Sequence, residues 1–208
     1  NNPTGTYLPN AEIKRLRKDL RENILLVLDG AYAEFMDSPD YDAGHALIEA
    51  TGNTIMTRTF SKIYGLASLR VGWAYSTQNI IHALERLRSP FNLTSPALAA
   101  AAAAMRDTVH TSIACRHNAR WLGITVPRLR ALGLEVAGGA GNFVLPKFTG
   151  PPSLSAAEAD SFLQVKGIIT RRVENYGLPH HLRISIGTDE EMEAVLSALT
   201  EFMETGDG

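Results

Sequence analysis

The sequence is nearly free of cysteine, since Cys115 is the only one among 208 residues. A lone cysteine excludes a disulfide within the chain and a thiolate cluster for a metal, and it is typical of a reducing compartment. Histidine offers no metal site either, because the adjacent His180 and His181 would point apart in an extended segment, and no Asp, Glu or Cys completes a ligand spacing. We therefore expect no metal.

An excess of charge of either sign is also missing. The 20 Lys and Arg residues are interspersed with 22 Asp and Glu residues, so the net charge is −2 and no basic stripe is present. The longest apolar run, Ala97 to Met105, is too short to span a bilayer, and the N-terminal residues show no secretion signal. These absences argue against nucleic acid or a membrane as a partner and favour a cytoplasmic protein that acts on small molecules.

The first part of the chain alternates between helical and strand patterns. The continuous apolar run Ile24–Leu28 ends at Asp29, which fits a strand that is covered on both faces in a mostly parallel sheet. The alternation predicts an α/β fold. The expected helices are 10–23, 43–50 and 77–87, and the expected strands are 24–28, 54–59 and 71–76.

The pattern changes after the break at Ser89–Asn92, which marks the passage into a second domain. An alanine-rich helix from Pro96 continues with interruptions toward Leu132, and Pro127 is expected to kink or restart it. Capping boxes open two further helices. The helices begin near 155 and 188, and the expected strands are 134–136, 142–148, 168–170 and 182–186.

One segment, Thr59 to Arg70, carries the strongest chemical signal. It places Lys62 beside hydroxyl side chains and an arginine in a turn that contains glycine. A lysine amine condenses with an aldehyde to form a Schiff base, while hydroxyls, backbone N–H groups and a guanidinium together hold a phosphate dianion. The combination implies pyridoxal 5'-phosphate (PLP) as the cofactor.

Two other segments fit the same chemistry, although each has an ordinary structural explanation. Asp29 follows the apolar strand and can keep a pyridinium nitrogen protonated, with Tyr32 donating to the phenolate oxygen of the ring; alternatively, Asp29 only caps a turn. Asn2 can offer its amide to the same oxygen. Its segment, Asn1–Gly5, is by itself only a turn signal, in which the Asn2–Pro3 bond could be cis.

The three segments together resemble the fold-type I PLP enzymes of the aspartate aminotransferase superfamily. Asn-Asn-Pro-Thr-Gly-Thr at residue 1, Phe-Ser-Lys-Ile-Tyr-Gly-Leu-Ala at residue 60 and Tyr-Gly-Leu-Pro at residue 176, which leads into Leu-Arg-Ile-Ser-Ile-Gly, are similar to the histidinol-phosphate aminotransferase family. The resemblance runs from Asn1 to about Phe202. It implies that residues 1–90 are the C-terminal part of a PLP-binding large domain and that 91–208 form a small α+β domain.

The resemblance also implies roles for individual residues. Lys62 would bind the cofactor covalently and move a proton, and Arg183 would bind the substrate carboxylate. Arg171 would approach the distal group of the substrate, unless the neighbouring Arg172 exchanges roles with it. The other cofactor contacts would be Thr59, Ser61 and Arg70 for the phosphate, Asp29 for the pyridine nitrogen, and Asn2 with Tyr32 for the phenolate oxygen.

The implied activity is an aminotransferase that moves an amino group between L-histidinol phosphate, or an aromatic amino acid, and 2-oxoglutarate, as a homodimer. A related PLP-dependent lyase or decarboxylase, and a catalytically silent fragment of an aminotransferase, are the alternatives. Family members carry an additional upstream stretch, so the chain resembles the C-terminal part of a larger enzyme. We expect the incomplete sheet to expose apolar edges that contact a partner.

Overall fold

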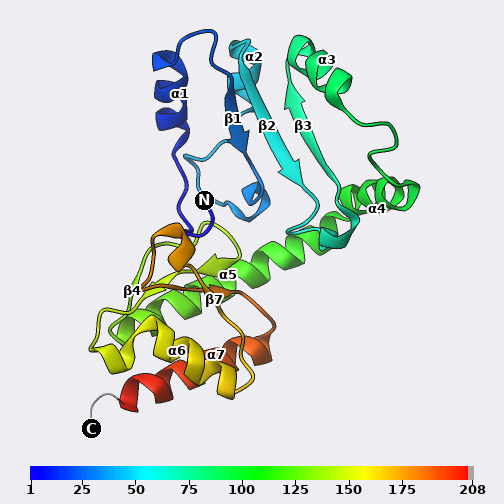
Figure 1. Cartoon of the computed structure of the whole chain (residues 1–208). Helices are drawn as coiled ribbons and strands as arrows, with labels where there is room; N and C mark the ends of the chain where they lie inside the picture. The colour runs from blue at the N-terminus through cyan, green and yellow to red at the C-terminus, as the bar shows by residue number, and fades with distance from the viewer. Residues whose placement is uncertain (206–208) are drawn as a thin grey trace. The chain divides into compact units, whose positions relative to one another are not determined.

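The computed structural model describes residues 1–205, which form two compact units (Figure 1). One unit comprises Leu8–Cys115, and the other joins Asn1–Tyr7 to the described residues from Arg116 onward. The fold is α/β, as the alternating pattern predicted. The domain boundary expected near residue 90 concerns the whole protein and stays a prediction. In the described part of the chain, no helix is both long and apolar enough to cross a membrane.

The unit Leu8–Cys115 is built on a three-stranded sheet in the order β1-β2-β3. The strands are β1 (Leu26–Asp29), β2 (Thr54–Thr59) and β3 (Gly72–Ser76). β1 runs parallel to β2, whereas β3 is antiparallel, as the arrowheads in Figure 1 show. Helix α2 (His45–Ala50) packs against β2 and β3 and buries Ile48. The other helices are α1 (Asn10–Asp19), α3 (Gln78–Leu87), α4 (Ser95–Arg106) and the start of α5 (Thr108–Ala131).

β1 differs from the expected strand in its burial. Leu26 and Leu28 are half-buried, but Val27 is 55% exposed and Leu25 just before the strand is 47% exposed. The prediction that both faces are covered was therefore wrong for the described structure. The alternating burial along β1 shows that the described elements cover only one of its faces.

Arg17 ties the beginnings of the two parallel strands together. This buried side chain of α1 donates hydrogen bonds to the carbonyl oxygens of Leu20, Arg21, Ile24 and Asn53 at 2.7–3.1 Å. The Ile24 carbonyl precedes β1, and the Asn53 carbonyl precedes β2. A guanidinium with five donors suits this task, because it satisfies carbonyl groups that would otherwise lack partners.

The other unit packs helices on short strands. Its strands are β4 (Glu135–Val136), β5 (Phe143–Val144), β6 (Pro146–Lys147), β7 (Arg171–Arg172) and β8 (Leu182–Ser185), in the orders β4-β6 and β5-β8-β7. Helices α6 (Ala156–Val165) and α7 (Asp189–Glu204) pack together over a core that includes Trp121, Leu163 and Leu199. The capping box at Thr188 and Glu191 has both reciprocal hydrogen bonds, which explains where α7 begins.

Three details differ from the sequence-based expectation. α5 continues through Pro127, because the buried Trp121 and Leu129 hold its two halves against the same core. The strand expected over 142–148 is divided into β5, which pairs with β8, and β6, which pairs with β4. β7 begins at Arg171, after the segment 168–170 for which a strand was expected.

Candidate active site

A first group of the predicted site residues lies on the side of the β1-β2-β3 sheet where β1 and β2 end and β3 begins. Asp29 pairs with Thr57 in the parallel register, and Thr59 pairs with Gly72 in the antiparallel register. The carboxyl ends of β1 and β2 and the beginning of β3 therefore lie at the same edge. Open α/β sheets bind their ligands at such edges.

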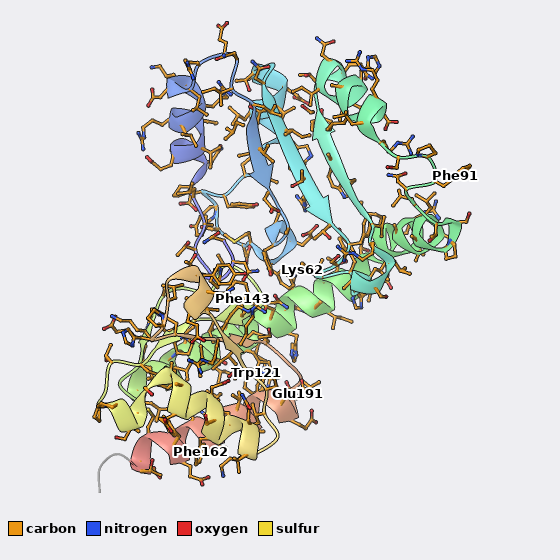
Figure 2. The ribbon with its side chains drawn as sticks, in the orientation of Figure 1. Lys62, Phe91, Trp121, Phe143, Phe162 and Glu191 are labelled. Carbon is orange, nitrogen blue, oxygen red and sulfur yellow. The ribbon has the colours of Figure 1, made fainter. Side chains whose placement is uncertain are left out.

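Lys62 occupies a tight turn directly beyond β2, as Figure 2 shows. The Ser61 N–H donates to Thr59 Oγ1 at 3.1 Å, and the Gly65 N–H donates to the Lys62 carbonyl at 2.9 Å. The ammonium nitrogen of Lys62 lies 5.2 Å from the centroid of the Tyr32 ring. The structure thus brings together the lysine and the tyrosine that the sequence predicted from separate segments.

Arg70 turns back toward the lysine turn. Its Nη1 donates to the Ala67 carbonyl at 2.7 Å and to Ser61 Oγ at 3.3 Å. The backbone of Arg70 is left-handed, with φ 52°, a conformation that non-glycine residues rarely adopt and that costs about 1 kcal/mol. This backbone conformation ends the short helix η2 (Ala67–Leu69) and leaves the guanidinium beside the Ser61 hydroxyl.

Asp29 is an exposed residue at the end of β1. Its Oδ1 accepts a hydrogen bond from the Ala31 N–H at 3.1 Å. The carboxylate therefore caps the turn after β1, which is the structural role that the sequence also allowed for Asp29. The turn leads into η1 (Ala33–Phe35), for which Tyr32 is the N-terminal cap residue. The same local structure therefore sets the positions of Asp29 and Tyr32.

Two glycines make this edge of the sheet possible. A Cβ on Gly72 would lie 2.6 Å from the Arg58 carbonyl oxygen, and one on Gly30 would lie 2.8 Å from Cδ of Arg58. Both distances are shorter than side chains tolerate. The absence of a side chain at Gly30 lets Arg58 pass beside the Asp29 turn.

The second group of predicted residues lies in the other unit. Arg183 on β8 donates through Nη1 to Asn2 Oδ1 at 2.8 Å, and its guanidinium lies 5.2 Å from the centroid of the Phe143 ring, which Figure 2 labels. Its Nε is buried and has no hydrogen-bond partner among the described residues. The Asn2–Pro3 peptide bond is cis.

Arg171 joins Arg183 on the same face of the small sheet. The two residues are direct cross-strand partners in the β7–β8 pair, so their side chains extend from one face. Both line a cleft of about 890 Å³ between residues 166–171, residues 183–187 and the beginning of α7. Arg172 instead forms an ion pair with Glu174. The predicted site residues thus form two groups, one in each unit.

Sequence reasoning missed Glu34 and Arg58. Arg58 Nη2 lies 2.7 Å from Glu34 Oε1, and only 13% and 9% of their respective side chains are exposed. The sequence offered one signal, an arginine near the end of the strand pattern 54–59, where a charge is costly unless it is paired. It did not indicate which carboxylate would be the partner.

The first group offers an amine, two hydroxyls, a guanidinium, a carboxylate and an aromatic ring. This donor set suits an anionic ligand with a reactive carbonyl. In the part of the chain that the structure describes, three or more Asp, Glu, His or Cys side chains do not gather in a way that could hold a metal ion.

Comparison with known proteins agrees with this chemistry. The family model of aminotransferase class I and II matches residues 1–199. The chain is 50% identical over 208 residues to a histidinol-phosphate aminotransferase of Rhodospirillum rubrum, with 100% of this chain and 56% of the relative covered. It therefore spans about half the length of the curated relatives that it matches.

Solved structures show the same likeness. Histidinol-phosphate aminotransferase from Sinorhizobium meliloti, in complex with pyridoxal-5'-phosphate, matches with a TM-score of 0.87 and 31% identity over 98% of this chain and 55% of that one. L-threonine-O-3-phosphate decarboxylase from Porphyromonas gingivalis matches with a TM-score of 0.81 and 26% identity over 98% and 62%. The chain belongs to the aminotransferase class I and II family.

Proposed function

We propose that the protein containing this chain is a PLP-dependent aminotransferase that transfers an amino group between L-histidinol phosphate, or an aromatic amino acid, and 2-oxoglutarate. The observation that carries the proposal is the meeting of Lys62, Tyr32 and the Ser61–Arg70 pair at the strand ends. The relatives named histidinol-phosphate aminotransferase support the substrate assignment.

The residues at this edge fit the three polar groups of PLP. Thr59, Ser61 and Arg70 would hold the phosphate, since they supply two hydroxyls and a guanidinium within one loop. Lys62 would hold the aldehyde carbon covalently through Nζ, and Asp29 would accept a hydrogen bond from the protonated ring nitrogen.

When bound, PLP supplies an electron sink for the negative charge that develops at the α-carbon of the substrate. Lys62 Nζ, once free, would take the proton from that carbon and act as the general base. Asn2 and Tyr32 would donate to the phenolate oxygen of the cofactor. Because Asn2 Oδ1 accepts from Arg183, its Nδ2 donor group is turned away from the arginine.

Two arginines would recognise the substrate. Arg183 would bind the carboxylate of the amino acid or 2-oxo acid, and its buried Nε without a partner is a donor for such an anion. Arg171 would bind the distal phosphate. Like charges directly opposite each other on neighbouring strands repel, and an anionic ligand in the cleft would remove this repulsion. The ion pair of Arg172 with Glu174 favours Arg171 over Arg172 for this role.

The similarity to a phosphothreonine decarboxylase supports one alternative, because the two reactions share the cofactor residues and differ in the orientation of the substrate. The test uses the full-length protein with PLP. Borohydride treatment should add the reduced cofactor to Lys62 in a peptide mass map. In a separate sample that has not been reduced, histidinol phosphate with 2-oxoglutarate should give glutamate without CO₂, whereas CO₂ release from an amino acid would favour the decarboxylase. A full-length protein without modified Lys62 would support the catalytically silent alternative.

The proposal includes a cytoplasmic homodimer with the domains 1–90 and 91–208. The homodimer is supported by the exposed apolar side chains around the α3–α4 connection, where Leu87 is 81% exposed and Phe91, labelled in Figure 2, is fully exposed. Surfaces of this kind are typical of interfaces. Light scattering on the full-length protein should give twice the monomer mass, and Phe91→Asp should lower the measured mass toward that of the monomer.

A further inference from the structure

An ion pair that is largely shielded from solvent joins two segments that carry proposed cofactor residues. Glu34 follows Tyr32 in η1, and Arg58 precedes Thr59 at the end of β2. Their side chains join at 2.7 Å with little exposure to solvent. A charge pair in such a place is costly to desolvate, and hydrophobic side chains of similar volume often serve stability as well or better. Stability alone therefore does not explain the pair.

The contacts of the pair connect three backbone segments. The guanidinium of Arg58 lies 5.6 Å from the centroid of the Trp73 ring on β3, and its stem passes Gly30 in the Asp29 turn. The Glu34 carbonyl accepts a hydrogen bond from Cys115 Sγ at 3.0 Å. The pair therefore contacts the turn after β1, the end of β2 and the beginning of β3, which contain or adjoin the proposed cofactor residues Asp29, Thr59 and Arg70.

The lysine turn follows the pair directly along the chain. Arg58 immediately precedes Thr59 at the end of β2, and Lys62 is four residues farther on. Within this turn the Tyr64 ring packs against the Phe60 ring, with 5.0 Å between their centroids, and burial and then the charge of Glu34 raise the pKa of Tyr64. The pair therefore connects the segment of Tyr32 with the segment that leads into Lys62.

We propose that Glu34 and Arg58 are positioning residues. They hold the Asp29–Tyr32 turn and the Lys62 turn in a fixed position relative to each other, so that the Tyr32 ring stays beside the Lys62 amine. The inference rests on the proposed function for its catalytic consequence. Its structural part concerns only residues of this chain. In this role neither Glu34 nor Arg58 would contact the reacting atoms.

The test compares variants of the full-length protein by hydrogen exchange without cofactor. Glu34→Gln should raise amide exchange about tenfold in both segments, 30–36 and 60–66, because it releases their common partner. Arg17→Met is the matched control, since Arg17 is also a buried arginine that ties strands together, but at the other end of β1 and β2. It should raise exchange near 20–26 and 51–54 instead.

A double variant separates positioning from stability. Glu34→Leu with Arg58→Met removes both charges and should restore much of the melting temperature that Glu34→Gln loses. Exchange in both segments should nevertheless stay raised, kcat should stay about tenfold lower with KM little changed, and the pH titration of the absorbance of the Lys62-bound cofactor should shift. Arg58→Lys is the milder variant, and it should change amide exchange and kcat in the same directions by about threefold.

Two results would overturn the inference. One is a change of exchange in only one of the two segments in Glu34→Gln, and the other is full recovery of exchange and kcat in the double variant. The proposed function fails in a different way, namely if the unmodified full-length protein yields no borohydride-trapped cofactor at Lys62. The exchange measurements retain their meaning in that case, because they need no cofactor.

Discussion

The indole N–H of Trp121 donates a hydrogen bond to the Asp189 carboxylate, with 2.5 Å between Nε1 and Oδ1. Trp121 is a core residue of α5, and Asp189 is the first residue of α7. Arg120 donates to the same carboxylate at 3.1 Å. The beginning of α7 is thus fixed to α5 by an ionised side chain, and this has a consequence for stability at low pH.

The Trp121 hydrogen bond, followed by that of Arg120, lowers the pKa of Asp189 below its usual 3.8. A lowered pKa in the folded state gives stability that is present above the unfolded-state value and is lost as the pH falls through the folded-state value. Asp189→Asn should therefore be less stable than the wild type at pH 7, and this difference should shrink below about pH 4. Urea unfolding at pH 7 and pH 3 measures it. Glu190→Gln is the control, and an equal pH response in both variants would contradict the prediction.

Substitution of Arg70 should separate folding from ligand binding. Arg70→Gly relieves the left-handed backbone, so the thermal stability of the protein without cofactor should stay the same or rise by about 1 kcal/mol. The affinity for PLP should fall about 100-fold, because a charge-assisted contact to phosphate is lost. Calorimetry and fluorescence titration test the two effects. A stability loss with unchanged PLP affinity would assign Arg70 a purely structural role.

The two arginines of the cleft should differ in what they recognise. Arg183→Lys should lower kcat/KM for all amino acid substrates about 10- to 100-fold, since a lysine cannot form the bidentate contact to a carboxylate. Arg171→Ala should lower kcat/KM for the phosphorylated substrate and leave that for an unphosphorylated aromatic amino acid nearly unchanged. Steady-state kinetics with both substrates measures the ratio. Arg172→Ala is the control, and a selective phosphate defect in that variant would exchange the roles.

Gly72 and Gly123 should respond oppositely to alanine. Gly72→Ala places a Cβ 2.6 Å from a backbone oxygen that cannot move freely, so it should destabilise the protein by about 1–3 kcal/mol. Gly123 lies inside α5 with open space around the added methyl group, and alanine there should stabilise by about 1 kcal/mol. Thermal unfolding of the two variants gives both values. A neutral Gly72→Ala would show that β2 and β3 can separate at this point.

Much of the local structure follows from the sequence. The strand over Thr54–Thr59 was predicted with its observed bounds, and the capping box at Thr188 and Glu191 gave the beginning of the last helix. These signals are short-range, since they depend on alternating side chains and on hydrogen bonds within four residues. The exposure of Val27 was not predicted, because burial depends on which elements cover a strand.

The sequence by itself determined the functional groups available to this protein, namely a lysine among hydroxyls and an arginine and the Asp29–Tyr32 segment, and it determined the family to which the chain belongs. These features are spacings along the chain. The tertiary structure alone decided that Glu34 pairs with Arg58, 24 residues away, and that Arg171 faces Arg183. The first depends on where η1 lies relative to β2, and the second depends on the register of β7 and β8; the packing of whole elements settles both, and no local pattern does.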